Sequence, residues 1–523
     1  MIFENENTFY LAREKGTEEL VHSRYERALR DLQENLGETM SNHIGGQPAE
    51  SSVGLFEDRF PGDISILNAR FQKSTEEDMR RAIKAARSSF DLWRSTDYHS
   101  RCDIFEKAAN IVSQRKHELA AMVTLENGKN RYEAMADVDE AIDFLRYYSS
   151  QMRENKGYVM DMPPPYPNEL PQDLLRPYGV WGVISPFNFP MAIMAGMSTG
   201  AMITGNAVVL KPSSDAPWPA LALARILEES GLTPGVFNVV AGPGETAGRE
   251  LVQNAAISGI AFTGSREVGI SAMKAFLEGR PRPFIAEMGG KNAVIVTNEA
   301  DLDQAVEGVG RAAFGYGGQK CSACSRVLVQ KDIASEFVRL LKDWTEKLTV
   351  GDPRDRDTFL GPLINRAAME RYRRAAMYAQ AEGRIETGGN VLTSSDLKGY
   401  YVEPTVVTGL KSGHELLNRE LFLPFLCVLE VPSLEKAVEV ANSSDYGLTA
   451  GIMSCSQAEV DYFMEEIEAG TVYANRRSGA STAAMVGSQP FVGWKNSGNT
   501  GKAAGGKYYL PQFMRERSQT RCL

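Results

Sequence analysis

Short apolar runs that alternate with helix-like stretches constrain the fold of this chain more than any other feature. Short strands separated by helices are typical of βαβ units and a mostly parallel sheet. The middle of the chain therefore predicts an α/β fold with a doubly wound, Rossmann-type dinucleotide-binding domain. The runs that predict its strands are residues 180–184, 207–210, 236–240, 259–262 and 293–296.

The regions around this core have other patterns. Apolar residues recur at helical spacing over residues 75–114, so the first region is expected to be rich in helix. The proline-rich segment 161–168 cannot hold a helix and predicts a linker or edge ribbon. A second α/β stretch covers about 302–473. Residues 507–514 predict a terminal strand that pairs with the proline-flanked ribbon of another subunit. Strands of the second stretch are expected near 327–329, 406–407 and 426–431.

A chain of 523 residues is long enough for several hydrophobic cores, since single cores rarely exceed about 250–300 residues. The family resemblance that the motifs below establish implies a cofactor domain, a catalytic domain and a small β oligomerisation flap, and with the flap a homo-oligomer, either a dimer or an assembly of dimers. The expected parts are 1–155 (N-terminal helical part of the cofactor domain), 156–175 (oligomerisation ribbon), 176–290 (dinucleotide-binding domain), 291–475 (catalytic domain), 476–504 (return segment with the substrate loop) and 505–523 (C-terminal oligomerisation strand).

Charge and composition exclude several classes of partner. The net charge of −10 provides no broad basic field for nucleic acid, and the basic run 371–374 is expected to be a solvated helix face. The N-terminus lacks the pattern of a secretory signal, and the longest apolar stretch, 191–207, is interrupted by polar residues before it could span a membrane. Six scattered cysteines fit a reducing compartment, so we expect a cytoplasmic protein.

Cys321 and Cys324 follow a glycine-rich turn, and two interpretations compete for them. A Cys-x-x-Cys pair can bind metal or cycle as a disulfide, but a zinc site needs two more ligands, and no second pair stands at ligand spacing, so no metal is expected. Alternatively, Cys321 is a nucleophile whose thiol pKa is lowered by Lys320 and by the start of a following helix. For an isolated cysteine, the default is a small buried thiol.

Two further side chains could assist a nucleophile. Glu287 precedes a Gly-Gly turn after an apolar segment, where burial would raise its pKa towards that of a useful base. Taken alone, it would be an ordinary surface carboxylate. Asn188 lies between aromatic residues and prolines at a strand end, from which its amide could reach an oxyanion. A helix-capping role for Asn188 is equally consistent with the local sequence.

Three features suggest a dinucleotide. Residues 242–248 and 262–269 are glycine-containing turns that follow predicted strands and precede helices, although neither has the strict G-x-G-x-x-G spacing. Lys211 stands at another strand end, where its ammonium group could bond ribose hydroxyls or meet a phosphate. Each feature alone is weak, and a lysine at a strand end is usually only solvated.

Taken together and in this order, the motifs resemble those of the aldehyde dehydrogenase superfamily over about residues 68–520. The agreement of six ordered motifs is too specific to arise by chance. The matching segments are 186–190 (Pro-Phe-Asn-Phe-Pro), 211–213 (Lys-Pro-Ser), 262–265 (Phe-Thr-Gly-Ser), 287–291 (Glu-Met-Gly-Gly-Lys), 318–321 (Gly-Gln-Lys-Cys) and 490–498 (Pro-Phe-Val-Gly-Trp-Lys-Asn-Ser-Gly).

The resemblance implies an NAD-dependent oxidation of an aldehyde to a carboxylate, with NADP possible. It makes Cys321 the nucleophile that forms a thioester, Glu287 the general base, and Asn188 with the Cys321 backbone N–H the oxyanion hole. Lys211 and Glu420 would hold the two riboses, with Phe422 against the nicotinamide. The full set of implied cofactor-binding residues is Ser185, Lys211, Ser213, Ser214, Gly244, Phe262, Gly264, Ser265, Glu420 and Phe422.

Within the superfamily the chain is most similar to the 1-pyrroline-5-carboxylate dehydrogenases, which oxidise glutamate semialdehyde in proline catabolism. In that subfamily the serine after the nucleophile, here Ser322, and a Thr-Gly-Ala loop bind the substrate carboxylate. This chain has Thr-Ala-Ala at 482–484, and Leu423 and Val492 replace two glycines of the family pattern, where they could narrow the pocket. The implied substrate-binding residues are Phe187, Ser322, Ala483, Ala484 and Phe491.

Several alternatives remain open. The substrate could be another short or carboxylated aldehyde. Ser214 stands where many relatives carry a glutamate that repels a 2′-phosphate, so NADP could be accepted. A CoA-dependent relative typically lacks Glu287, and a non-catalytic scaffold of the same fold would not need Cys321, Glu287 and Asn188 together. A cysteine hydrolase would need a histidine partner, and none of the five histidines lies in a recognisable motif.

Overall fold

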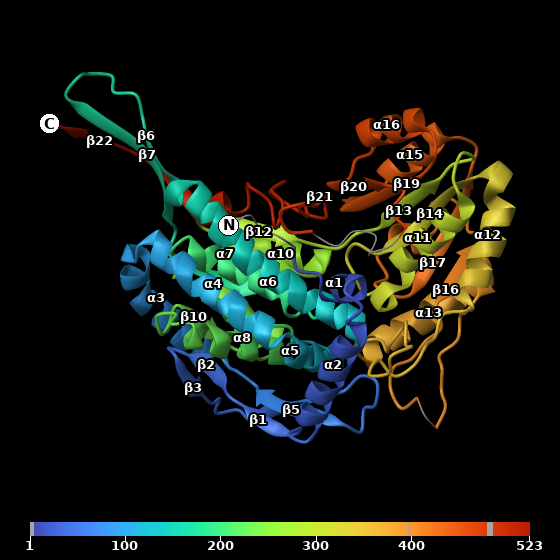
Figure 1. The fold of residues 1–523 in the computed structure, drawn as a ribbon, viewed down its shortest axis with the longest axis horizontal. Coiled ribbons are helices and arrows are strands. Elements are labelled where there is room, and N and C mark those ends of the chain that lie inside the picture. The colour runs from blue at the N-terminus through green and yellow to red at the C-terminus, as the bar shows by residue number, and fades with distance from the viewer. Residues whose placement is uncertain (1–4, 396, 478–484) are drawn as a thin grey trace.

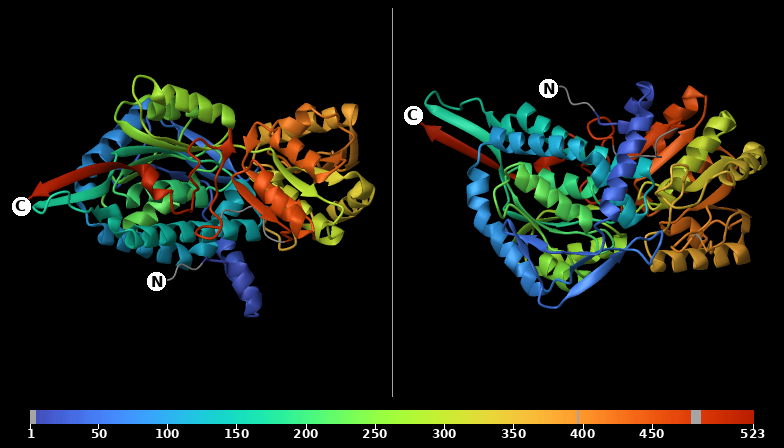
Figure 2. Two further views of the ribbon diagram at one scale, coloured as in Figure 1. Left: turned by 90° about the horizontal axis from the view of Figure 1, so that it is seen from above. Right: turned by 60° about the horizontal axis from the view of Figure 1, so that its bottom comes forward.

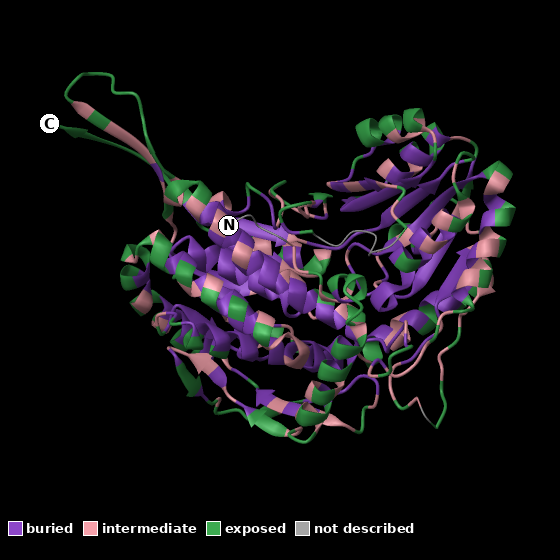
Figure 3. Cartoon of the chain, in the orientation of Figure 1, coloured by how far each residue is buried: buried purple, intermediate pink, exposed green. Residues whose placement is uncertain are grey.

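The structure is a computed structural model that describes residues 5–395, 397–477 and 485–523. Figure 1 shows two lobes side by side, each built on a seven-stranded sheet, and a narrow ribbon that projects from the first lobe. Strands of both sheets are buried, whereas the outer helices carry the exposed residues (Figure 3). The α/β fold expected from the sequence is confirmed.

The first sheet has the Rossmann strand order, β12-β11-β8-β9-β10, and these five strands are parallel. Because β8 lies at the point where the strand order reverses, the carboxyl ends of β8, β9 and β11 open onto one crevice. The four strands β8 to β11 match expected apolar runs, but β12 was not among the expected strands. The expected run 293–296 is wrong for this sheet, because it forms β13 (Asn292–Val296) of the second sheet. The bounds of the five strands are β8 Val180–Ile184, β9 Ala207–Lys211, β10 Phe237–Val239, β11 Ile257–Thr263 and β12 Phe284–Glu287.

The N-terminal region contains strands that the sequence analysis missed. Two of them, β2 and β3, extend the first sheet in antiparallel fashion beyond β10, and three others form a small separate sheet. All are short, and their sequences lack a clear two-residue alternation. Their bounds are β1 Glu38–Met40, β2 Asn42–Ile44, β3 Gln47–Ala49, β4 Leu55–Arg59 and β5 Leu67–Gln72.

The second sheet has the order β15-β16-β17-β14-β13-β19-β20, and only β15 runs antiparallel to its neighbour. Its central strands match the predicted apolar runs. The bounds are β13 Asn292–Val296, β14 Cys324–Gln330, β15 Arg384–Thr387, β16 Thr405–Thr408, β17 Phe425–Val431, β19 Thr449–Met453 and β20 Thr471–Ala474, with the pair β18 Tyr446–Gly447 and β21 Trp494–Lys495 beside it.

Helices cover both sheets, and local sequence accounts for several of their starts. Thr75 and Asp78 form a reciprocal capping box at the start of α3, and Asn130 accepts from two N–H groups at the start of α6. The first-lobe helices are α1 Thr8–Glu14, α2 Glu18–Gln33, α3 Glu76–Ser95, α4 Tyr98–Gln114, α5 Lys116–Asn127, α6 Arg131–Glu154, α7 Ala192–Ile203, α8 Trp218–Glu229, α9 Arg249–Gln253 and α10 Arg266–Leu277. The second lobe has α11 Leu302–Phe314, α12 Lys331–Thr345, α13 Arg366–Glu382, α14 Glu415–Asn418, α15 Leu434–Asn442 and α16 Gln457–Glu466.

The predicted terminal strand at 507–514 is wrong in place and in partner. Residues Leu510–Phe513 form a 3-10 turn, and the strand β22 begins only at Met514 and ends at Cys522. It pairs with β7 (Glu169–Pro177) of its own chain, beside β6 (Val159–Asp161), and the three strands project from the body in every view (Figure 2). A proline in the 3-10 turn and the aromatic residues around it favour packing over pairing there.

No helix within the described parts of the chain combines the length and the run of apolar side chains that crossing a bilayer requires.

Aromatic side chains pack tightly against one face of the first sheet. Trp181 on β8 is fully buried, and its ring centroid lies 4.6 Å from that of Phe513. On the neighbouring strand β11, a Cβ built on Gly259 would lie 2.6 Å from the Trp181 ring. Glycine is therefore required at position 259 by side-chain packing across the strands.

We expect Gly259→Ala to lower the free energy of unfolding by about 1–3 kcal/mol, because the added methyl group overpacks against Trp181. The thermal unfolding midpoint, followed by circular dichroism, measures the change. A midpoint equal to that of the wild type would contradict this account of the sheet.

Candidate active site

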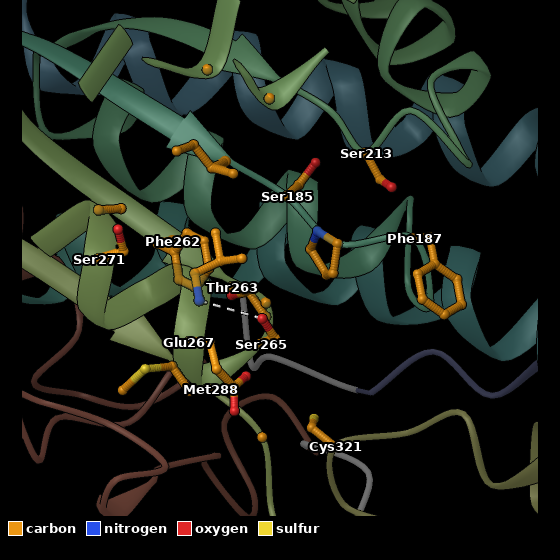
Figure 4. A pocket seen from close by; sticks show the side chains of 18 of the residues that line it. Ser185, Phe187, Ser213, Phe262, Thr263, Ser265, Glu267, Ser271, Met288 and Cys321 are labelled. Atoms are coloured by element: carbon orange, nitrogen blue, oxygen red, sulfur yellow. Dashed lines mark hydrogen bonds between the residues drawn. The ribbon is translucent and has the colours of Figure 1, made fainter. Parts of the chain in front are cut away.

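A single elongated cavity of about 1090 Å³ lies where the carboxyl ends of the first sheet face the second lobe. Its lining comes from both lobes, with Ser185, Lys211 and Phe262 on one side and Cys321, Glu420 and Phe422 on the other. Figure 4 shows Ser271 and Phe262 towards one end and Phe187 and Cys321 towards the other. A cleft of this size, at the strand-order reversal of a doubly wound sheet, fits a dinucleotide.

Cys321 is held from the second sheet. The side-chain amide of Asn292, at the start of β13, donates to the Cys321 carbonyl at 2.7 Å and to the Ala323 carbonyl at 2.9 Å. Thr449 N–H in turn donates to Asn292 Oδ1 at 3.0 Å. The buried amide thus fixes the backbone on both sides of Ser322. Its NH₂ group donates both hydrogen bonds, and its oxygen accepts the one from Thr449.

The two glycines after Glu287 allow the backbone to approach this loop. A Cβ on Gly290 would lie 2.6 Å from the Cys321 carbonyl oxygen, and a Cβ on Gly289 would collide with the Glu420 carboxylate. Gly290 N–H donates to that carboxylate at 3.0 Å. Gly318, at φ +64°, faces the Leu423 carbonyl in the same manner. The Gly-Gly pair is therefore a requirement of close packing between the candidate base and nucleophile segments.

The expected lowering of the Cys321 pKa is wrong. Lys320 Nζ forms an ion pair with Glu133, at 2.8 and 2.6 Å from the two carboxylate oxygens, so its charge is already paired. The expected helix after Cys321 is also absent from the structure, because the chain continues into the strand β14. Burial raises the pKa of the Cys321 thiol to about 12, with Glu420 and Glu287 adding to the rise, while backbone N–H groups oppose it. The thiol is therefore neutral at rest.

Glu287 is the last residue of β12, and its carboxyl group has few hydrogen-bond partners among the described residues. Burial raises its pKa well above the ordinary value, opposed only by a hydrogen bond from the Gly493 backbone N–H. Its Oε2 atom is buried and has no hydrogen-bond partner among the residues that the structure describes. The expected direction of the shift is confirmed, and a carboxyl group of this kind can exchange a proton near neutral pH.

The return segment holds the strand end that carries Glu287. Met288 N–H donates to the Ser497 carbonyl at 2.8 Å, and the fully buried Ser497 hydroxyl donates to the Gly289 carbonyl at 2.7 Å. Asn499 Oδ1 accepts from Ala286 N–H at 2.8 Å. The serine of the 490–498 motif therefore acts by fixing the backbone around Glu287.

Asn188 lies on the loop between β8 and α7, is only 3% exposed and lines the cavity. The loop is fixed by Asn127, whose side-chain amide donates to the Phe187 carbonyl at 3.2 Å. The Phe187 ring meets the Phe422 ring edge to face, with centroids 5.8 Å apart. Phe422 itself adopts φ +59°, a left-handed conformation that turns its side chain away from the regular strand direction.

The far part of the cavity suits the anionic and sugar parts of a dinucleotide. Ser265 caps α10, whose N-terminus opens into the cavity, and a helix N-terminus favours negative charge. Lys211 ends β9, and burial lowers its pKa to about 8. Burial raises the pKa of Glu420 to about 7, despite the hydrogen bond from Gly290 N–H.

The cavity brings most of the predicted residues together. It is lined by Asn188, Cys321, Phe187 and the complete cofactor set, Ser185, Lys211, Ser213, Ser214, Gly244, Phe262, Gly264, Ser265, Glu420 and Phe422. Glu287 adjoins it through Met288 and Gly289. The buried Ser322 and the half-buried Phe491 are not among the residues that line it. Ala483 and Ala484 lie outside the described residues.

Three residues that hold or line the cavity were not predicted from the sequence: Asn292, Asn127 and Arg371. Asn292 and Asn127 received no role, although the asparagine that follows Gly-Gly-Lys at a strand start was a usable signal. The solvated face expected for 371–374 is wrong at its first two positions, because Arg371 lines the cavity and Tyr372 is fully buried. Arg371 Nε donates to the Leu421 carbonyl at 2.8 Å, a contact made only in the tertiary structure.

Cys324 and the two departures from the family pattern, Leu423 and Val492, lie away from the lining of the cavity. Cys324 packs in the core of the second lobe, whereas Cys321 lines the cavity, so the two thiols occupy different environments. The Leu423 side chain is buried among Leu421, Phe425 and their neighbours. Neither Leu423 nor Val492 is among the residues that line the cavity in the described structure.

Comparisons with known proteins agree with this geometry. A model of the aldehyde dehydrogenase family matches residues 61–518. The 1-pyrroline-5-carboxylate dehydrogenase of Geobacillus sp. (strain WCH70) is 37% identical over 500 residues, which are 94% of this chain and 95% of the relative. The 1-pyrroline-5-carboxylate dehydrogenase from Thermus, solved with bound NAD, has a TM-score of 0.91 at 34% identity and covers 96% of each chain.

A further structure is longer than this protein. Proline utilization A from Bdellovibrio bacteriovorus has a TM-score of 0.91 at 34% identity and covers 96% of this chain, but the chain spans only 52% of that protein. The family model and the full-length relatives lead to the same assignment. The chain belongs to the aldehyde dehydrogenase family, the NAD-dependent oxidoreductases that act on aldehydes.

Proposed function

We propose that this aldehyde dehydrogenase oxidises L-glutamate 5-semialdehyde, the open form of 1-pyrroline-5-carboxylate, to glutamate with NAD. The observation that carries the proposal is the relationship to 1-pyrroline-5-carboxylate dehydrogenases, at 36–38% identity over more than nine-tenths of the chain. Ser322, beside the nucleophile, supports a carboxylate-bearing substrate. The Thr-Ala-Ala sequence at 482–484 leaves another short or carboxylated aldehyde as the second candidate.

Cys321 is proposed to form the covalent intermediate. Attack of its thiolate on the aldehyde carbon converts the carbonyl oxygen into an oxyanion, which the Asn188 amide and the Cys321 backbone N–H stabilise. The location of Asn188 on the same cavity supports this role. Loss of hydride from the tetrahedral carbon then leaves a thioester on Cys321.

Glu287 is proposed to act as the base. Because the Cys321 thiol is neutral at rest, its proton must leave before attack, and the raised pKa of Glu287 suits it to accept that proton. In the second half of the reaction Glu287 takes a proton from water, which attacks the thioester and releases the carboxylate product. The absence of a hydrogen-bond partner for Glu287 Oε2 among the described residues leaves an acceptor free for this exchange.

NAD, when bound, supplies the hydride acceptor. The chain's own residues would orient it: Lys211 and Glu420 the two riboses, Gly264 and Ser265 the pyrophosphate, and Phe422 the nicotinamide. The neighbouring Ser213 and Ser214, Gly244 and Phe262 complete the proposed binding surface, and Ser214 brings no negative charge that would repel the 2′-phosphate of NADP. Phe187, Ser322, Phe491, Ala483 and Ala484 are proposed to contact the aldehyde.

We also propose a role for each part of the chain. Residues 1–155 and 176–290 bind the cofactor, 291–475 carry the nucleophile, and 476–504 close the substrate side. The ribbon 156–175 and the terminal segment 505–523 join subunits into a homo-oligomer, in the cytoplasm. Exposed apolar residues on this projecting ribbon, including Met160, Met162 and Leu170, support a role in subunit contact.

Purified protein should reduce NAD with 1-pyrroline-5-carboxylate, with kcat/KM roughly tenfold or more above that for unbranched aldehydes lacking a carboxylate. Absorbance of the reduced nicotinamide follows the reaction. Cys321→Ala should retain NAD binding and lose turnover. Reduction with simple aldehydes alone would favour the second candidate substrate, and turnover by the Cys321 variant would rule out the proposed mechanism.

Glu287→Gln should lower kcat by about 10²–10⁴-fold, because the variant can neither accept the Cys321 proton before attack nor activate the water that hydrolyses the thioester. In the wild type, kcat should rise with pH above the ordinary carboxyl range, since Glu287 must lose its proton before it can accept another and its pKa is raised. Stopped-flow absorbance at several pH values measures both effects. An unchanged pH profile in the glutamine variant would exclude Glu287 as the base.

Removal of residues 515–523, which form most of β22, should reduce the size of the assembly, because β7 loses its pairing partner in the projecting ribbon. Light scattering coupled to gel filtration gives the mass of each form. The proposal requires an oligomeric wild type, so a monomeric wild-type protein would contradict it.

A further inference from the structure

The segments that carry Asn188 and Cys321 come from different lobes, yet one buried side chain contacts both. Lys129 lies between α5 and α6 and is completely buried. Its ammonium nitrogen is 3.6 Å from the ring centroid of Phe189, the residue after Asn188. The same nitrogen is 5.1 Å from the ring centroid of Tyr316, in the turn that leads to Cys321.

The ammonium group of Lys129 forms an ion pair with Asp137, and Glu133 adds a second favourable charge nearby. Lys129 Nζ lies 3.0 Å from Asp137 Oδ2, and the side chains of this pair are fully buried. Asp137 Oδ1 accepts from the Ala192 N–H at 2.7 Å, at the start of α7. The ion pair therefore contacts the loop at two points after Asn188, the Phe189 ring and the backbone N–H of Ala192.

The turn on the nucleophile side is held by the same stretch of chain. The Tyr316 hydroxyl donates to the Asn127 carbonyl at 2.9 Å, while the Asn127 side chain donates to the Phe187 carbonyl. Tyr316 adopts φ +49°, an unfavourable conformation for a bulky residue that persists only when its surroundings hold it. The ring position of Tyr316 is thus set jointly by this hydrogen bond and by the ammonium group above it.

We propose that Lys129, paired with Asp137, is a positioning residue that sets the separation of Asn188 and Cys321. The inference rests on the roles proposed for those two residues. A buried ion pair is weak evidence for stability, because desolvation offsets most of the mutual attraction. A desolvated ammonium group that faces two aromatic rings is, by contrast, a directional contact. Lys129 therefore fixes where the two rings lie, and through them the two reacting segments.

Lys129→Met should lower kcat about 100-fold, the effect expected when reacting groups move by about 1 Å, while the dissociation constant for NAD stays unchanged. The variant leaves the Asp137 charge unpaired, so its thermal midpoint will also fall. Steady-state kinetics with any aldehyde that the wild type oxidises, together with NAD titration and thermal unfolding, gives the three values.

The double variant Lys129→Met, Asp137→Asn separates positioning from stability, because it removes the unpaired charge but does not restore the contacts to the rings. We expect its thermal midpoint to recover towards that of the wild type while kcat stays as low as in the single variant. Recovery of kcat together with the midpoint would overturn the proposal.

Phe189→Leu provides a test if the double variant does not fold. It keeps the ion pair and an apolar side chain but removes the ring, so kcat should fall about tenfold at a nearly unchanged thermal midpoint. An unchanged kcat would overturn the proposal.

Lys116→Met is the matched control. Lys116 is a largely buried lysine at the opposite end of α5, where it pairs with Glu6 and Asp139, so its loss should affect the thermal midpoint and leave kcat unchanged. An equal fall in kcat would show that any buried lysine between these helices has the same effect, and would overturn a specific role for Lys129. Failure of the proposed function is distinguishable, because it appears as turnover by Cys321→Ala in a protein with intact Lys129.

Discussion

The active cavity depends on three places where the backbone approaches another part of the chain too closely for a Cβ atom. Gly289 faces the Glu420 carboxylate, Gly290 faces the Cys321 carbonyl and Gly318 faces the Leu423 carbonyl. The Gly290 contact joins the segment of the proposed base to that of the proposed nucleophile, and the other two contacts join one of these segments to the stretch that carries Glu420 and Leu423. Since a Cβ atom at any of the three would separate these segments, the spacing of the reacting groups follows from backbone packing before any side-chain chemistry begins.

Burial then determines the charge state of the site. The Cys321 thiol, the Glu287 carboxyl group and the Glu420 carboxyl group all have raised pKa values, and desolvation is the largest cause for each. Desolvation therefore shifts all three groups towards their protonated forms and brings the pKa values of the two carboxyl groups closer to neutral pH, where a carboxyl group can exchange a proton. Asn292 satisfies the backbone carbonyls around the thiol without contributing charge.

The sequence predicted the parallel core well because strands covered on both faces form continuous apolar runs, as in β8, β9 and β13. It failed at β1–β5, which are short and half-exposed, and at residues 507–514, where aromatic packing prevails over strand pairing. The Cys321 pKa was misjudged for a different reason. The effect of Lys320 depends on Glu133, 187 residues away in sequence, and no local pattern reveals that contact.

The division of the site between two lobes has a consequence for how the protein loses activity. Asn188 is carried by the first lobe and Cys321 by the second, so the proposed oxyanion site belongs to the interface between the lobes and to neither lobe alone. A slight rotation at that interface would separate the two groups while every strand and helix stayed intact. The proposed site therefore depends on the contact between the lobes, and a shift at that contact would remove activity from a protein that keeps its full secondary structure.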